Sequence, residues 1–167
     1  MRNTILLVIL TALPAAAEPL FLDVTAQMGL SGGGHAAWAD YDGDGWADVL
    51  IGANLYHNEA GKRFVLVNEA AGLSAKGDGG VWGDCDNDGD LDLIVNNVND
   101  FATIYRNDSR SADGNNYLRI RLQGPPGNTG AFGTRVKMYA GDLQNYREHY
   151  TSRGYASSVE EYVHFGL

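Results

Sequence analysis

The chain has 167 residues and a net charge of −9, a length that allows about one domain or one domain with an appendage. The acidity is local: residues 18–110 carry 16 acidic and 5 basic residues, whereas residues 111–167 carry 5 and 6. Such an acidic surface repels phosphate backbones, so nucleic acid is excluded as a sensible partner. The single cysteine, Cys85, excludes an internal disulfide, and we interpret it as a small buried filler.

Residues 1–17 have the pattern of a secretory signal. Arg2 supplies the positive end, residues 5–13 form an apolar run, and three alanines precede a cleavage site expected after residue 17. The apolar run is far below the ~20 residues that a membrane span needs. We therefore predict a secreted protein, extracellular or periplasmic, without a membrane span.

The pattern D-x-D-x-D-G-x-x-D occurs twice, at residues 40–48 and 84–92. Carboxylates packed this densely repel one another unless a cation lies between them, and oxygen ligands at alternating positions suit Ca²⁺. The glycine at position 6 permits a sharp turn. We predict two calcium sites, with side-chain ligands at positions 1, 3, 5 and 9 and a backbone carbonyl at position 7. The predicted ligands are Asp40, Asp42, Asp44, Trp46 and Asp48 in the first loop and Asp84, Asp86, Asp88, Asp90 and Asp92 in the second.

The loops do not continue as EF-hands. An EF-hand closes with a glutamate at position 12, where this chain has Ile51 and Val95. Short β-type runs flank both loops, so each loop is expected to join two strands. The alternative is an Asp- and Gly-rich surface turn without metal, and the duplication within one chain favours the metal site.

Residues 21–107 read as two copies of one unit. The segment 21–30 aligns with 64–73 at a shift of 43, and the acidic loops align at a shift of 44 with Trp38 over Trp82. A period in the forties with several short strands is the size of a propeller blade. We interpret the two tryptophans as core anchors, since aromatic side chains dominate core burial.

Residues 111–167 are also β-type, after a linker expected over 108–114. Apolar and basic residues alternate in 118–122 and in 135–140, and Gly141-Asp142 can form the turn that follows. The basic positions are Arg119, Arg121, Arg135 and Lys137. They are interpreted as the solvated face of a sheet, with acidic-glycan binding as the alternative.

The repeat region resembles a known family. F-x-D-V-T-A-x-x-G-L at 21–30, G-G-x-x-x-W-A-D-Y-D-G-D-G-x-x-D at 33–48 and L-Y-H-N at 55–58 are similar to the FG-GAP or VCBS-type repeat. The resemblance implies a calcium-bound hairpin in each blade-like unit. Repeats of this family also occur in hydrolases and lyases, which keeps an enzyme as an alternative.

The following segment resembles the ASPIC/UnbV domain. N-N-Y-L-R-I-R-L at 115–122, G-A-F-G-T-R-V at 130–136 and H-F-G-L at 164–167 carry the likeness, although Thr129 stands where that domain has an arginine. The combination is similar to secreted proteins related to cartilage acidic protein. Such proteins carry more repeats and a longer last domain, so the chain looks like a shortened member.

We therefore expect an all-β chain made of a signal peptide (1–17), two propeller-blade-like repeats (18–110) and a small, incomplete β domain (111–167). The expected function is an extracellular calcium-binding interaction or adhesion module whose partner is a protein or a glycan. Two repeats leave open strand edges, which favours self-association. The alternatives are a fragment of a calcium-stabilised propeller enzyme and a non-functional truncated member.

We expect no catalytic activity. The four histidines, His35, His57, His149 and His164, have no metal-like spacing, and neither a nucleophile elbow nor a phosphate-binding loop is present in the sequence. The loop carboxylates already have a predicted metal role, so they are not free to act as an acid–base pair.

Overall fold

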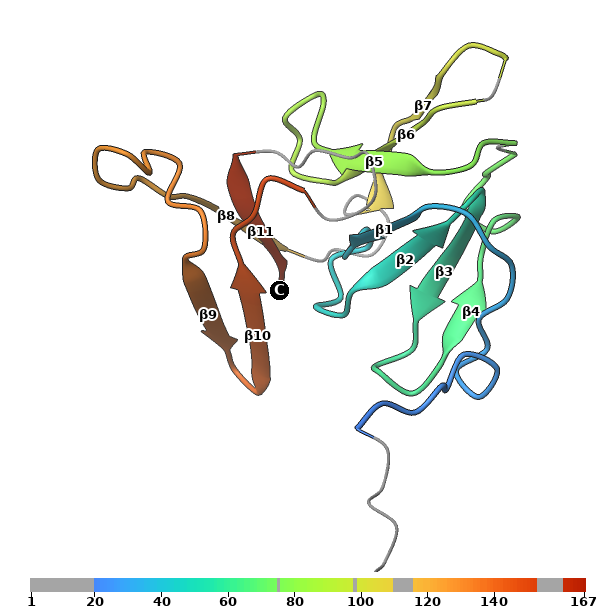
Figure 1. Ribbon diagram of the computed structural model, residues 1–167, viewed down its shortest axis with the longest axis horizontal. Coiled ribbons are helices and arrows are strands. Elements are labelled where there is room, and N and C mark those ends of the chain that lie inside the picture. Colours follow the sequence, from blue (N-terminus) through green and yellow to red (C-terminus); the bar gives the residue numbers. More distant parts are fainter. Residues whose placement is uncertain (1–19, 75, 98, 110–115, 153–160) are drawn as a thin grey trace, which may run out of the picture.

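The computed structural model describes residues 20–74, 76–97, 99–109, 116–152 and 161–167 (Figure 1). Eleven strands carry the architecture of these residues, and every strand pair is antiparallel. The predicted all-β fold is confirmed. The expected signal peptide and most of the expected linker lie outside the described residues.

The first sheet has the strand order β1-β2-β3-β4. Its strands are β1 (Ala36–Ala39), β2 (Asp48–Ile51), β3 (Asn54–Asn58) and β4 (Phe64–Leu66). The first acidic loop connects β1 to β2, as the flanking apolar runs predicted. The strands are short, and each next strand follows after a turn, which gives a meander of the kind found in a propeller blade.

The second sheet repeats this arrangement with three strands, in the order β5-β6-β7. They are β5 (Gly80–Gly83), β6 (Asp92–Val95) and β7 (Thr103–Tyr105), and the second acidic loop connects β5 to β6. Trp82 lies opposite Leu93 in the second sheet as Trp38 lies opposite Val49 in the first. The two hairpins therefore have the same register, in agreement with the 44-residue shift.

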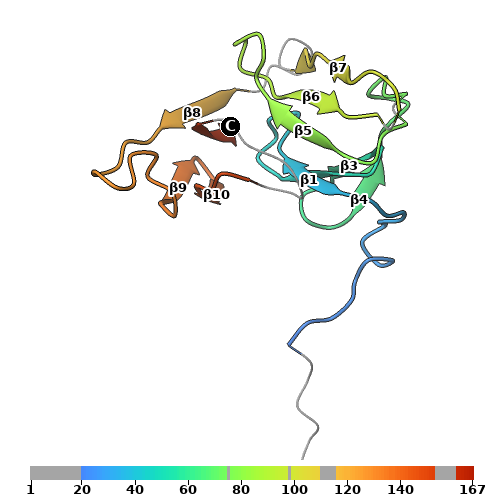
Figure 2. The same cartoon turned by 45° about the horizontal axis from the view of Figure 1, so that its top comes forward.

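The two sheets lie next to each other (Figure 2) and share a small apolar core. Leu50 and Leu55 from the first sheet pack with Leu93 and Val95 from the second. The ring of Tyr41 stacks on Trp82, with ring centroids 6.2 Å apart. A loop residue thus helps to hold the two units together.

The two tryptophans differ, which corrects the prediction that both are core anchors. Trp82 packs against the shared core, and its Nε1 donates to the carbonyl of Ala37, 3.4 Å away. Trp38 is 45% exposed and meets the Phe64 ring edge-on. It lies on the face of β1 opposite to the buried Ala37 and Ala39, because successive side chains of a strand alternate between faces.

Residues 116–152 and 161–167 form two two-stranded sheets, β8 with β11 and β9 with β10. These strands are β8 (Tyr117–Arg121), β9 (Arg135–Ala140), β10 (Leu143–Glu148) and β11 (Tyr162–Gly166). Met138, Val163 and Phe165 form their common core. The predicted turn after residue 140 is confirmed, with Gly141 at a φ of 58°.

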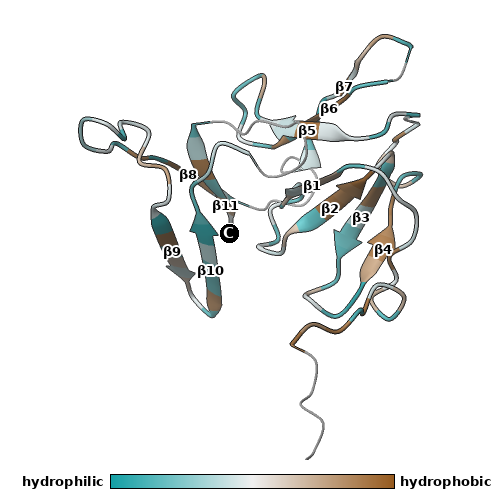
Figure 3. Cartoon of the chain, in the orientation of Figure 1, coloured by the Kyte–Doolittle hydropathy of each residue, from teal (hydrophilic) through white to brown (hydrophobic). Residues whose placement is uncertain are grey.

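Hydrophobic residues gather on strands such as β2 and β4, while the acidic loops are hydrophilic (Figure 3). Within the described ranges, none of the helices has the length and apolar character that crossing a membrane requires.

Candidate metal centre

The two acidic loops have the same internal hydrogen bonds. The position-1 carboxylates, Asp40 and Asp84, each accept from the backbone N–H of the position-6 glycine at 3.2 Å. The position-3 carboxylate accepts from the N–H of position 5 at 3.3 Å in both loops. The position-5 carboxylate accepts from the N–H of position 7, at 2.8 Å in the first loop and 2.9 Å in the second. These side chains bend the chain into one shape twice.

The last carboxylate of each loop is buried and fastens the loop to a strand. Asp48 accepts from the N–H of Tyr41 at 3.1 Å and from that of Asn58 at 2.8 Å. Asp92 accepts from the corresponding residues, Cys85 at 2.8 Å and Asn107 at 2.9 Å. Neither aspartate side chain is exposed to solvent. Both closing carboxylates are therefore set by main-chain donors.

Carboxylate oxygens converge in both loops. In the first loop, oxygens of Asp40, Asp42 and Asp44 all lie within 4.8 Å of one another. In the second, the same holds for Asp84, Asp86 and Asp92. Three carboxylates at this spacing repel one another strongly, and oxygen donors without nitrogen or sulfur suit a hard cation such as Ca²⁺.

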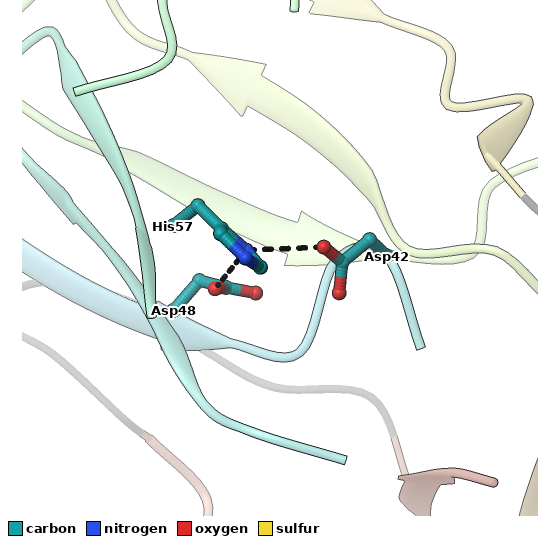
Figure 4. A group of neighbouring side chains, drawn as sticks. All are labelled: Asp42, Asp48 and His57. Carbon is teal, nitrogen blue, oxygen red and sulfur yellow. Dashed lines mark ion pairs between the residues drawn. The ribbon is translucent and has the colours of Figure 1, made fainter. Parts of the chain in front are cut away.

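His57 adds a nitrogen to the first loop (Figure 4). Its Nδ1 lies 3.1 Å from Oδ2 of Asp42 and 3.2 Å from Oδ1 of Asp48. The imidazole reaches the loop from β3, across the hairpin. His57 was not predicted, because the spacing of the histidines is not that of a metal site, although L-Y-H-N at 55–58 corresponds to I-Y-R-N at 104–107. The equivalent residue in the second repeat is Arg106.

Burial makes the first loop costly to ionise. Burial, together with the charge of Asp44, raises the pKa of Asp40 to about 6. Burial is also the main cause that raises the pKa of Asp48 to about 8, with a smaller contribution from Asp42. Burial and Asp44 raise the pKa of Asp42 as well. Without a cation, this loop holds its negative charge against an electrostatic penalty.

The second loop is electrostatically different. Burial acts to raise the pKa of Asp92, but hydrogen bonds from Cys85 and Asn107 and the charge of Arg106 outweigh it, so the pKa is lowered. Asp84 is paired with Arg119 of β8, and the Nη1–Oδ2 distance is 2.5 Å. The other oxygen, Oδ1 of Asp84, is buried and accepts no hydrogen bond from the described residues. An orphaned, fully buried carboxylate oxygen inside an acidic cluster fits a cation ligand.

The structure brings together most of the predicted ligands. Asp48 groups with Asp42 and His57 rather than with Asp40 and Asp44. Asp88 and Asp90 lie outside the second cluster, where Asp88 accepts the N–H of Asp90. Trp46 was predicted to use its carbonyl, and the residue is 42% exposed.

Two asparagines support the loops and were not predicted. Nδ2 of Asn58 donates to the carbonyl of Ala47 at 2.9 Å, and Nδ2 of Asn107 donates to that of Leu91 at 3.1 Å. Both stand at the end of the repeated L-Y-H-N and I-Y-R-N segments. Their presence in the alignment of the two units was the signal that could have identified them.

Cys85 was predicted to be buried, and this was wrong. The residue is exposed, at position 2 of the second loop. A hydrogen bond to Asp92 is the main cause that raises the pKa of its thiol. The equivalent Tyr41 is covered because it stacks on Trp82, meets the His57 ring edge-on and packs against the shared core.

Repeated hairpins with acidic loops, followed by a small two-sheet unit, define an all-β repeat protein. Residues 32–66, which contain the first sheet and its loop, match the family model of the FG-GAP repeat. Residues 124–167 match the model described as ASPIC and UnbV. These two matches agree with the FG-GAP plus ASPIC/UnbV architecture that the motifs resembled. Neither the curated proteins nor the solved structures yielded a match.

Proposed function

We propose that this protein is an extracellular β-repeat module that binds one Ca²⁺ in each acidic loop and serves as a non-catalytic interaction unit. The main observation behind this proposal is that the acidic loop occurs twice, at residues 40–48 and 84–92, with the same internal hydrogen bonds. The orphaned Oδ1 of Asp84 supports a cation at the second loop, and the raised pKa of Asp40 and Asp48 supports one at the first. When bound, calcium would neutralise clustered carboxylates and fix the hairpins.

The residues that would hold the ions are those of the two clusters. In the first loop these are Asp40, Asp42 and Asp44, and Asp48 closes the loop by accepting the N–H of Tyr41. In the second they are Asp84, Asp86 and Asp92. Of the remaining predicted ligands, Trp46 and Asp90 would use backbone carbonyls at position 7, as Ca²⁺ loops commonly do, whereas Asp88 lies outside the second cluster.

Exposed apolar residues at the edge of the second sheet support an interaction role. Phe101 is 90% exposed and Ile104 of β7 is 63% exposed. Sheet edges offer unpaired backbone groups to another chain, and apolar side chains beside such an edge strengthen the contact. A second copy of this chain or another protein could bind through such edge pairing.

Calorimetric titration of the metal-stripped protein tests the calcium sites. We expect two bound ions, and Asp84→Ala should abolish binding at the second loop while the first still titrates. Asp108→Ala, which removes an exposed carboxylate outside both loops, is the control and should leave two sites. Absence of any binding at millimolar Ca²⁺ would refute the calcium function.

A further inference from the structure

Both acidic loops contact the C-terminal unit as well as their own hairpins. The side chain of Asp84 is fully buried beneath Arg119 of β8, whose side chain is only 17% exposed. On the first loop, the N–H of Gly166 in β11 donates to Oδ2 of Asp40 at 3.2 Å. The position-1 aspartate of each loop is therefore held by a donor from residues 116–167.

The fit around these contacts is close. Nδ2 of Asn145 donates to the carbonyl of Gly45 at 2.8 Å, and Gly89 faces the ring of Tyr117 with no room for a Cβ. Arg147 is near enough to Asp40 for the two charges to interact. Both loops thus present an acidic, glycine-containing surface to a basic, aromatic one.

We propose that Arg119 is a tethered cation that docks the C-terminal unit on the second acidic loop, and that Arg119 and Ca²⁺ neutralise the same carboxylate, Asp84. In the metal-free protein the guanidinium compensates the buried charge. When Ca²⁺ binds through the other oxygen of Asp84, it repels the Arg119 guanidinium, so each cation weakens the binding of the other to Asp84. By linkage the effect is reciprocal.

Two features separate this role from ordinary packing. Arg121, two residues along β8, is 70% exposed and pairs with the exposed Glu161. Arg119 also lies over the Tyr162 ring, 4.4 Å from its centroid, so its removal costs that contact too. The charge at Asp84 and the stacking on Tyr162 are separable, because a Tyr162→Leu variant keeps the guanidinium.

Thermal unfolding in chelator and in millimolar Ca²⁺ tests the proposal, with wild type, Arg119→Gln, Arg121→Gln and Tyr162→Leu. In chelator, Arg119→Gln should lower the Tm by about 5–10 °C, because it leaves a buried carboxylate unpaired, while Arg121→Gln should change it by about 1 °C or less. In Ca²⁺ the loss for Arg119→Gln should shrink by at least about half, since the ion takes over the neutralisation. Tyr162→Leu should lower the Tm by the same amount in both buffers.

The results separate this inference from the calcium function on which its second half rests. If Arg119→Gln matches Arg121→Gln in chelator, Arg119 does not dock the unit. Equal losses for Arg119→Gln in both buffers would mean that the ion and Arg119 do not share Asp84. If Ca²⁺ does not raise the Tm of any variant or of the wild type, the calcium function is refuted. The measurements in chelator still show whether Arg119 docks the C-terminal unit.

A second variant covers the case in which Arg119→Gln does not fold in chelator. Arg119→Lys keeps a cation and should retain most of the wild-type Tm. A loss as large as that of Arg119→Gln would show that the shape of the guanidinium matters and its charge does not, which would overturn the proposal.

Discussion

Asp48 and Asp92 occupy the same place in the two units, yet their pKa values move in opposite directions. Their backbone donors are equivalent, but burial is the main cause of the rise at Asp48, whereas at Asp92 hydrogen bonds and a positive charge outweigh burial. Asp48 lies beside Asp42 in a buried cluster, whereas Asp92 has Cys85 and the positive Arg106 nearby. The repeated motif therefore fixes the geometry of the closing carboxylate but not the cost of its charge.

The first loop should make stability depend on pH when metal is absent. Unfolded aspartates ionise near pH 4, whereas folded Asp40 and Asp48 hold protons up to about pH 6 and about pH 8. The folded state binds more protons in this window, so the free energy of unfolding should fall as pH rises from about 4 to 8. Urea unfolding of metal-stripped protein at pH 5, 6.5 and 8 measures this.

Calcium should remove or reverse this pH trend, because the ion binds the deprotonated carboxylates. Asp48→Asn is the matched variant: it keeps the side-chain shape and should flatten the metal-free dependence above pH 6. A metal-free stability that stays constant between pH 5 and 8 would contradict the prediction.

Asn58 should be needed for the first loop. It is buried, it donates to the carbonyl of Ala47, and its Oδ1 accepts from the N–H of Gly61 at 2.8 Å. Asn58→Ala should lower the free energy of unfolding by about 1–3 kcal/mol, because buried backbone groups lose their partners. Urea unfolding tests the stability, and calorimetry should show weaker Ca²⁺ binding at one site only.

Asn128→Ala is the matched control for this variant. Asn128 also makes two side-chain hydrogen bonds to its own turn, both with Phe132, but it is exposed. Water can replace those partners, so the loss should stay below about 1 kcal/mol. Equal losses for the two asparagines would mean that Asn58 has no special role in the loop.

At the scale of elements, the hairpins follow from local sequence. The spacing of D-x-D-x-D-G-x-x-D sets the loop, and the apolar runs on either side set β1, β2, β5 and β6. These features were predictable because each depends on residues within one hairpin. The same reasoning correctly found the β9–β10 turn at Gly141.

The contacts between elements were not predictable in the same way. Trp38 and Cys85 were expected to be buried, because the pattern shows which side of a strand or loop a residue takes but not what covers that side. The basic positions of residues 118–137 were expected to be solvated; this holds for Arg121, whereas Arg119 is paired with Asp84. That partner is 35 residues away, in the loop between β5 and β6.

Gly89 of the second loop packs against Tyr117 of β8, so a side chain at this position should lower the free energy of unfolding. Its φ is 101°, and an added Cβ would collide with the ring of Tyr117. Gly127 has a similar φ of 93° with open space around it. Gly89→Ala should therefore reduce stability by about 1–3 kcal/mol more than Gly127→Ala, which adds backbone strain alone.

Chemical unfolding of both glycine variants measures the difference. Since the two positions share their backbone strain, the excess loss reports the contact between the second loop and Tyr117. Equal losses for the two variants would mean that the Tyr117 ring can move aside without a loss of stability.

At the scale of the whole molecule, two blade-like sheets and a two-sheet unit leave strand edges. In the described residues β4 ends the first sheet and β7 ends the second. β7 carries the exposed Ile104, and Phe101 precedes it. Such an edge can accept a strand from another copy.

We expect self-association in the presence of Ca²⁺, when the hairpins are fixed. Light scattering should show a dimer or larger species, with a shift toward monomer in chelator. Ile104→Lys places a charge beside the edge and should reduce the mass, whereas Tyr139→Lys on β9, which is also exposed, should not. A monomer at every concentration in Ca²⁺ would refute self-association.

The hydrogen bond between Gly166 and Asp40 joins residues 126 positions apart. Each hairpin closes over a few residues, so it can form early and quickly, whereas a contact of this separation carries a large loop-closure entropy. Docking of the C-terminal unit should therefore be a late step of folding. Until it occurs, Asp84 lacks Arg119 and Asp40 lacks the backbone N–H of Gly166, and free cations in the surroundings are the charges available to compensate them. The rate of this last step should accordingly depend on the ionic composition of the compartment in which the chain folds.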